Sequence, residues 1–123
     1  MDHLAVGKKG EDIACKYLEQ KGHRIVDRNF RVKFGEIDVV SEKAGLIYFS
    51  EVKTVNLSNR EVGEHRPEDN VSPWKMKKLS RAIELYILKK LPDYKKEWYF
   101  LVIAVKLDVL CQTAKVKVIS DVV

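Results

Sequence analysis

The most constraining feature of this 123-residue chain is the uninterrupted apolar run from Trp98 to Val105. A strand with one solvated face alternates apolar and polar residues, whereas a strand covered on both faces can be apolar throughout. We therefore expect residues 98–105 to form a strand that is buried on both faces of its sheet. The length suits one compact domain and leaves little room for a second. The sequence predicts a single domain, residues 1–123.

Hydrophobic periodicity predicts the remaining elements. Apolar residues at helical spacing favour a first helix between Gly10 and Gly22 and a second that starts at Ser72-Pro73 and ends before Pro92. Further strands are predicted within residues 23–33, 36–40, 46–54 and 114–118, the last as a half-exposed edge strand, and residues 55–71 as a long loop. The prediction is an α/β fold of order α-β-β-β-α-β-β, a mixed central β-sheet flanked by helices.

One segment carries the excess positive charge. Residues 74–97 contain eight lysines and arginines against three acids, which accounts for the whole net charge of +5. A basic segment on a nearly neutral domain is typical of polyanion binders, because neutralised phosphates release counterions. A solvated lysine-rich helix face is the alternative.

Several classes of protein do not fit this sequence. No apolar run approaches the roughly 18 residues that cross a bilayer, and the polar N-terminus lacks a secretory signal pattern, so we expect a cytoplasmic protein without a membrane partner. Cys15 and Cys111 have no CxxC or Cys/His spacing. Neither a disulfide framework nor a thiolate zinc site is therefore expected.

Acidic residues and one lysine are spaced so that they meet on one sheet surface. Residues two apart on a strand share a face. If the strands within 36–40 and 46–54 pair as a hairpin, Asp38, Glu51 and Lys53 come together, and Glu11 on the core-facing stripe of the first helix adds a third acid. Inward-facing carboxylates need a partner, such as a metal ion or the Lys53 ammonium.

Mg²⁺ or Mn²⁺ suits this set of groups. Asp38, Glu51 and the main-chain carbonyl of Val52 would offer oxygen ligands, and Lys53 would orient a water or offset charge on a phosphate. Acidic residues that simply alternate on a half-exposed strand are the alternative.

Four motifs, followed by a lysine-rich helix, carry a family resemblance: Gly10-Glu11, Arg28-Asn29-x-Arg31, Gly35-Glu36-Ile37-Asp38 and Glu51-Val52-Lys53-Thr54. In this order they resemble the YraN-like family of predicted endonucleases, which belongs to the PD-(D/E)xK nuclease superfamily with the archaeal Holliday-junction resolvases and type II restriction enzymes. The resemblance covers residues 7–88.

The resemblance implies a restriction-endonuclease-like core and Mg²⁺-dependent hydrolysis of nucleic-acid phosphodiesters, with structured or branched DNA as the substrate. Asp38 and Glu51 match the metal-binding acids, Lys53 the catalytic lysine, and Glu11 the first-helix acid of the resolvase-like branch. Glu36 matches a characteristic family position whose role stays open between a metal-site acid and a surface residue.

The chain departs from the superfamily pattern at two positions. Ile37 replaces the proline of the superfamily name, and Val55 stands where a basic residue is common, which removes one phosphate contact.

The basic residues near these motifs are assigned to the substrate backbone: Arg28, Arg31, Lys33, Lys75 and Lys78. Two further readings are a nucleic-acid-binding module that does not cleave and a scaffold for a protein partner. A homodimer would suit paired cuts on a two-fold-symmetric junction. The sequence does not decide between DNA and RNA as the nucleic acid that the protein binds.

Overall fold

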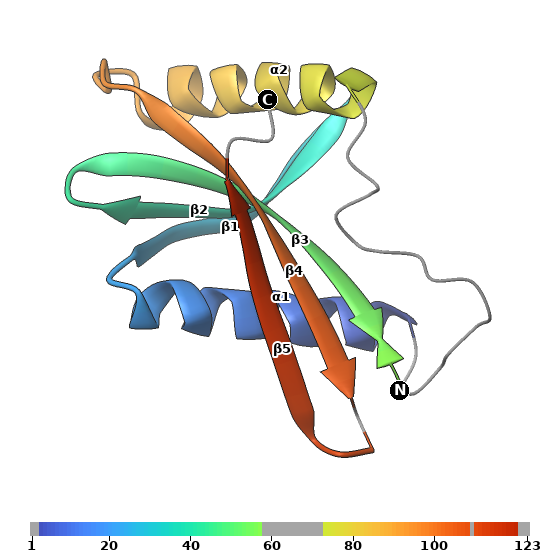
Figure 1. The fold of residues 1–123 in the computed structure, drawn as a ribbon. Coiled ribbons are helices and arrows are strands. Elements are labelled where there is room, and N and C mark those ends of the chain that lie inside the picture. Colours follow the sequence, from blue (N-terminus) through green and yellow to red (C-terminus); the bar gives the residue numbers. More distant parts are fainter. Residues whose placement is uncertain (1–2, 58–72, 109, 121–123) are drawn as a thin grey trace.

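The computed structural model describes residues 3–57, 73–108 and 110–120, which form two helices and a five-stranded sheet (Figure 1). The elements in chain order are α1 (His3–Gln20), β1 (Arg24–Val32), β2 (Gly35–Lys43), β3 (Leu46–Asn56), α2 (Pro73–Lys90), β4 (Trp98–Asp108) and β5 (Thr113–Ser120). The predicted order α-β-β-β-α-β-β and the mixed sheet flanked by helices are confirmed.

The strands lie in the sheet in their sequence order, β1-β2-β3-β4-β5. β3 and β4 pair in parallel and all other neighbours are antiparallel. A parallel pair needs a long crossover connection, and α2 occupies it.

Each helix covers one face of the sheet. On the α1 side, Ala14 and Leu18 pack against Val39, Leu101 and neighbouring residues of β4. On the α2 side, the core consists of Leu79, Ala82, Ile83 and Tyr86 against residues of β2, β3 and β4, among them Val40, Phe49 and Val102.

The apolar run in β4 is buried on both faces from Phe100 to Val105, as predicted, whereas Tyr99 at its start is 37% exposed. Leu101, Ile103 and Val105 contact the α1 layer, whereas Phe100 and Val102 contact the α2 layer. At the sheet edge, β5 leaves Lys117 exposed between the partly buried Val116 and Val118.

Several predicted boundaries were wrong, among them the end of β4, which runs to Asp108 rather than to Val105. α1 begins at His3 rather than at Gly10, so both Gly7 and Gly10 lie inside the helix. β2 runs to Lys43 rather than ending at Val40, and β3 runs to Asn56 because residues 55 and 56 pair with β4, although both were assigned to the loop. The rest of that predicted loop, from residue 58, lies outside the described residues.

The strand β1 reverses its side-chain alternation at Asn29, whose φ is +56°. Arg28 reaches α1 on one side of the sheet, whereas Phe30 packs edge-on against Tyr86 of α2 on the other. Two residues separated by one position would share a face in a regular strand. Since Arg28 pairs with Val39 and Phe30 with Ile37, the reversal lies opposite Asp38.

In the described part of the chain, neither helix is long and apolar enough to cross a membrane.

Candidate metal centre

Three carboxylates from two elements form what we call the acidic cluster: Glu11 of α1, and Glu36 and Asp38 of β2. Each offers one oxygen atom, and these atoms all lie within 4.8 Å of one another. All three residues are partly buried. The sequence hypothesis placed Glu11 and Asp38 together, and the structure brings in Glu36, whose role was left open.

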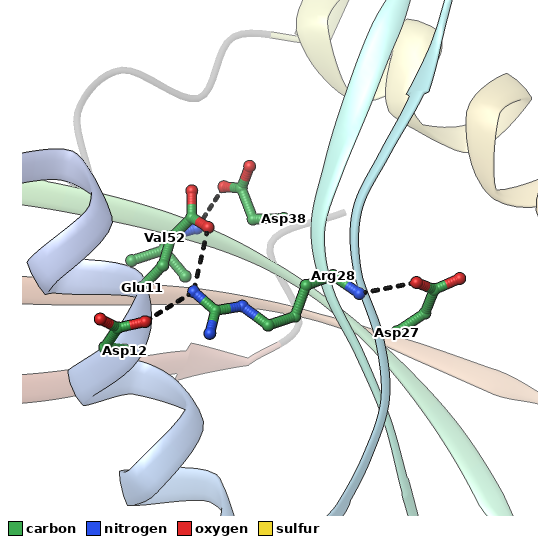
Figure 2. Close-up of polar contacts among 6 residues, drawn as sticks. All are labelled: Glu11, Asp12, Asp27, Arg28, Asp38 and Val52. Atoms are coloured by element: carbon green, nitrogen blue, oxygen red, sulfur yellow. Dashed lines mark hydrogen bonds and ion pairs between the residues drawn. The ribbon is translucent and has the colours of Figure 1, made fainter. Parts of the chain in front are cut away.

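Asp38 lies where the hairpin of β2 and β3 stops pairing. The last pair of that ladder is Val39 with Ser50, so Asp38 and Glu51 are the next residues along the two strands. The Val52 N–H donates a hydrogen bond of 2.8 Å to Asp38 Oδ2 (Figure 2). The side chain thereby takes the place of a main-chain acceptor at the end of the ladder.

The Asp38 carboxyl group titrates far from its ordinary range. Burial raises its pKa from 3.8 to about 7. The hydrogen bond from Val52 opposes this shift, and the negative charges of Glu11, Glu51 and Glu36 add to it. Negative charge is therefore crowded at this position.

Glu51 and Lys53 form an ion pair on β3, one strand further into the sheet. Lys53 Nζ lies 3.1 Å from Glu51 Oε1, and the two side chains are 21% and 10% exposed. Glu51 stands outside the acidic cluster, although its charge contributes to the raised pKa of Asp38. The structure thus brings the predicted Asp38, Glu51 and Lys53 into one region and pairs Glu51 with the lysine.

Both arginines that were predicted to contact phosphate pair with acids in the structure. Arg28 Nη2 lies 2.9 Å from Asp12 Oδ1 and 3.5 Å from Glu11 Oε1 (Figure 2). Arg31 Nη2 lies 3.2 Å from Glu36 Oε2. Each arginine therefore offsets the charge of one member of the acidic cluster.

The three lysines of that assignment have different surroundings. Lys33 is exposed in the turn between β1 and β2, and Lys78 is partly buried on α2. The side chain of Lys75 lies outside the described residues.

A close approach of α1 to β3 fixes where Glu11 sits. A Cβ atom placed on Gly10 would lie 1.9 Å from Thr54 Oγ1 and 2.8 Å from Thr54 Cβ. Only a residue without a side chain fits there. Two motifs far apart in sequence meet at this contact, and Glu11 follows directly on the helix.

Sequence reasoning missed Asp12 and gave no structural role to Asn29 or Gly10. The only feature of the sequence that points to Asp12 is its position directly after Glu11. The unusual position of Asn29 becomes visible only when the strand conformation is known, although asparagine is among the residues that tolerate a positive φ.

Together, the fold and the site define a small three-layer α/β/α protein with an acidic cluster where α1, β2 and β3 meet. The chain belongs to the UPF0102 family. The sequence-family model described as "Uncharacterised protein family UPF0102" matches residues 10–112 of this chain, a range that includes the acidic cluster, Glu51 and Lys53. The expected membership of the YraN-like family is thereby confirmed.

Proteins of this family from three bacteria illustrate the similarity. A UPF0102 protein of Persephonella marina is 40% identical over 84 residues, which cover 68% of this chain and 69% of the relative. That of Syntrophomonas wolfei is 40% identical over 100 residues, 81% of this chain and 83% of the relative. That of Dictyoglomus thermophilum is 35% identical over 96 residues, 78% of each chain.

Proposed function

We propose that this protein is a metal-dependent endonuclease that hydrolyses phosphodiester bonds of DNA, with branched or otherwise structured DNA as its substrate. The observation that carries the proposal is the acidic cluster lying next to the Glu51–Lys53 ion pair. Carboxylates and a lysine in one partly buried region supply the groups that metal-assisted phosphodiester hydrolysis uses. The family resemblance of the four motifs supports the same reaction.

The residues at the site fit a hard divalent cation. Oxygen atoms within 4.8 Å of one another, supplied by a helix and a strand, are compatible with binding to one ion. Asp38, Glu11 and Glu36 would hold Mg²⁺ or Mn²⁺, with Glu51 and the main-chain carbonyl of Val52 as further donors on β3. When bound, the ion would stabilise the negative charge that grows on the phosphate.

Lys53 supplies the positively charged side chain that would act on the substrate phosphate and the attacking water. Its ammonium group is held 3.1 Å from Glu51 Oε1 on a strand in the centre of the sheet, and its side chain is 21% exposed. An ammonium group held at the rim of such a site orients a water molecule by hydrogen bonding and offsets charge on the substrate phosphate.

Exposed basic residues would position the DNA backbone without reading its sequence. Lys33 in the turn between β1 and β2 and Lys77 on α2 are exposed. Exposed ammonium groups can contact phosphate, and the excess of positive charge in the sequence lies on residues 74–97.

One observation favours a second function. Arg28 and Arg31 already offset the charge of Glu11 and Glu36, so the acids also have a structural explanation that needs no metal. Under that reading the protein is a nucleic-acid-binding module that does not cleave.

Cleavage of a labelled panel separates these functions. The panel contains single-stranded DNA, duplex, flap, four-way junction and RNA, each with Mg²⁺, Mn²⁺ or EDTA. Wild type and Lys115→Ala, a change on exposed β5, are expected to cut in the presence of metal, whereas Asp38→Asn and Lys53→Ala are expected to be inactive and folded. If all four proteins fail to cut but bind with a steep, metal-independent salt dependence, the binding-module function replaces the nuclease.

A further inference from the structure

Arg28 lies between two consecutive acids of α1, although it belongs to β1. A single guanidinium nitrogen, Nη2, is 2.9 Å from Asp12 Oδ1 and 3.5 Å from Glu11 Oε1 (Figure 2). The side chain is 34% exposed, and its Nε atom is buried. The guanidinium therefore links the first strand to the helix that carries one acid of the cluster.

The backbone of β1 is bent to place Arg28 there. Phe30 is anchored in the α2 core by an edge-on contact with Tyr86, at 5.0 Å between ring centroids. In a regular strand Arg28 would share that face. The positive φ of Asn29 turns Arg28 to the opposite face, toward α1. A non-glycine residue in this conformation persists only where its surroundings hold it.

The two contacts of Arg28 differ in a way that suits a supporting role. The shorter one is to Asp12, which lies outside the acidic cluster. The longer one is to a single oxygen of Glu11, and a carboxylate has two oxygens with about four acceptor sites. Glu11 can therefore contact Arg28 and still bind a cation, whereas a phosphate that binds Nη2 would have to compete with both acids.

We propose that Arg28 is a positioning residue: held by Asp12, it keeps the Glu11 carboxylate in the acidic cluster in the arrangement that a divalent cation needs, and it does not bind phosphate. This inference rests on the proposed function, because it assigns Arg28 to the metal site of that function. Partners that orient metal ligands in this way commonly change metal affinity by 10–100-fold.

Calorimetric titration of the full-length protein with Mn²⁺ alone tests the proposal without any activity measurement. Arg28→Ala is expected to bind Mn²⁺ about 10-fold more weakly than wild type. The direction of this change in Mn²⁺ affinity separates positioning from simple electrostatics, because the loss of a positive charge beside three carboxylates would by itself tighten cation binding. Arg28→Lys keeps the charge and loses the two-acid contact, and it is expected to show a smaller weakening.

The matched control is Arg24→Ala. Arg24 lies on the same strand and forms an Arg–carboxylate pair with Glu42 at 2.9 Å, with its side chain 68% exposed. It is away from the cluster, so Mn²⁺ affinity is expected to equal that of wild type. Far-UV circular dichroism of each variant checks that it is folded.

Binding of duplex DNA in EDTA at several salt concentrations gives the second measurement. The slope of log affinity against log salt is expected to be the same for Arg28→Ala and wild type, whereas loss of a phosphate contact would reduce it by about 1. Unchanged or tighter Mn²⁺ binding in both Arg28 variants, or a reduced slope, would overturn the inference. Failure of wild type to bind Mn²⁺ would instead overturn the proposed function.

Discussion

The contact between Gly10 and Thr54 gives the sharpest test of how the fold positions the site. In Gly10→Ala the new methyl carbon would lie 1.9 Å from Thr54 Oγ1, 2.7 Å from Cγ2 and 2.8 Å from Cβ. Carbon atoms pack at about 3.5–4.0 Å. A change of Thr54 rotamer moves only the first two atoms, because Cβ is fixed to the backbone of β3. Helix and strand must therefore separate.

The chain contains its own control for this substitution. Gly7 lies one turn earlier in α1, and a Cβ atom there meets nothing within 4 Å. Alanine is favoured over glycine inside a helix by about 1 kcal/mol at both positions, so that gain cancels when the two variants are compared. The remaining difference is the overpacking at Thr54, for which about 1–3 kcal/mol is typical.

Urea unfolding followed by circular dichroism measures this difference. Gly7→Ala is expected to be more stable than wild type, and Gly10→Ala less stable than Gly7→Ala by about 1–3 kcal/mol. Adding Thr54→Ala to Gly10→Ala removes two of the three close approaches and is expected to recover part of the loss. Equal stability of the two glycine variants would refute the claim that this contact sets the distance between α1 and β3.

Three further changes have expected outcomes. Asn29→Gly accepts the φ of +56° and is expected to unfold at a urea concentration near that of wild type, whereas Asn29→Val is expected to lose about 1–2 kcal/mol; equal losses would contradict the backbone argument. In EDTA, Asp38→Asn is expected to be more stable than wild type above pH 7. Burial raises the pKa of Asp38 from 3.8 to about 7, so ionisation of this carboxyl group above pH 7 destabilises the folded wild type, whereas asparagine stays neutral. The gain in the free energy of unfolding is at most about 4 kcal/mol and disappears near pH 4, where Asp38 is protonated in both the folded and the unfolded chain. A gain that does not depend on pH would contradict this cause. Ala44→Asn is expected to raise the free energy of unfolding by about 0.5–1 kcal/mol, because Ala44 and Gly45 both have positive φ in a two-residue hairpin turn that favours Asn-Gly. Thermal unfolding measures this gain, and a lower melting temperature than that of wild type would contradict the argument.

The fold was predictable because its strongest patterns are local. The apolar run of β4 requires cover on both faces, and two amphipathic helices are available to supply it. The extent of α1 was predicted less well. Gly7 and Gly10 disfavour a helix by intrinsic preference, yet Gly10 is required there by the contact with Thr54. Tertiary packing decided that boundary.

The site was predictable only as far as strand alternation and helix periodicity reach. They placed Glu11, Asp38, Glu51 and Lys53 near one another, and the structure has them in one region. They could not show that Glu36 joins the acidic cluster while Glu51 pairs with Lys53. Such pairings depend on which oxygen and nitrogen atoms come within a few ångströms, and the spacing of residues carries no information on that scale.

The two arginines of the motif Arg28-Asn29-x-Arg31 show why charge in a sequence does not define its use. The positive φ of Asn29 reverses the side-chain alternation of β1 between them, so Arg28 lies against α1. Arg31 stays 77% exposed in its contact with Glu36. An exposed ion pair contributes little to stability, so a phosphate can replace Glu36 as the partner of Arg31 at small cost. Arg28 would lose two acids that anchor it to a helix. Under the proposed function, this one motif would therefore divide between support of the metal site by Arg28 and contact with DNA by Arg31.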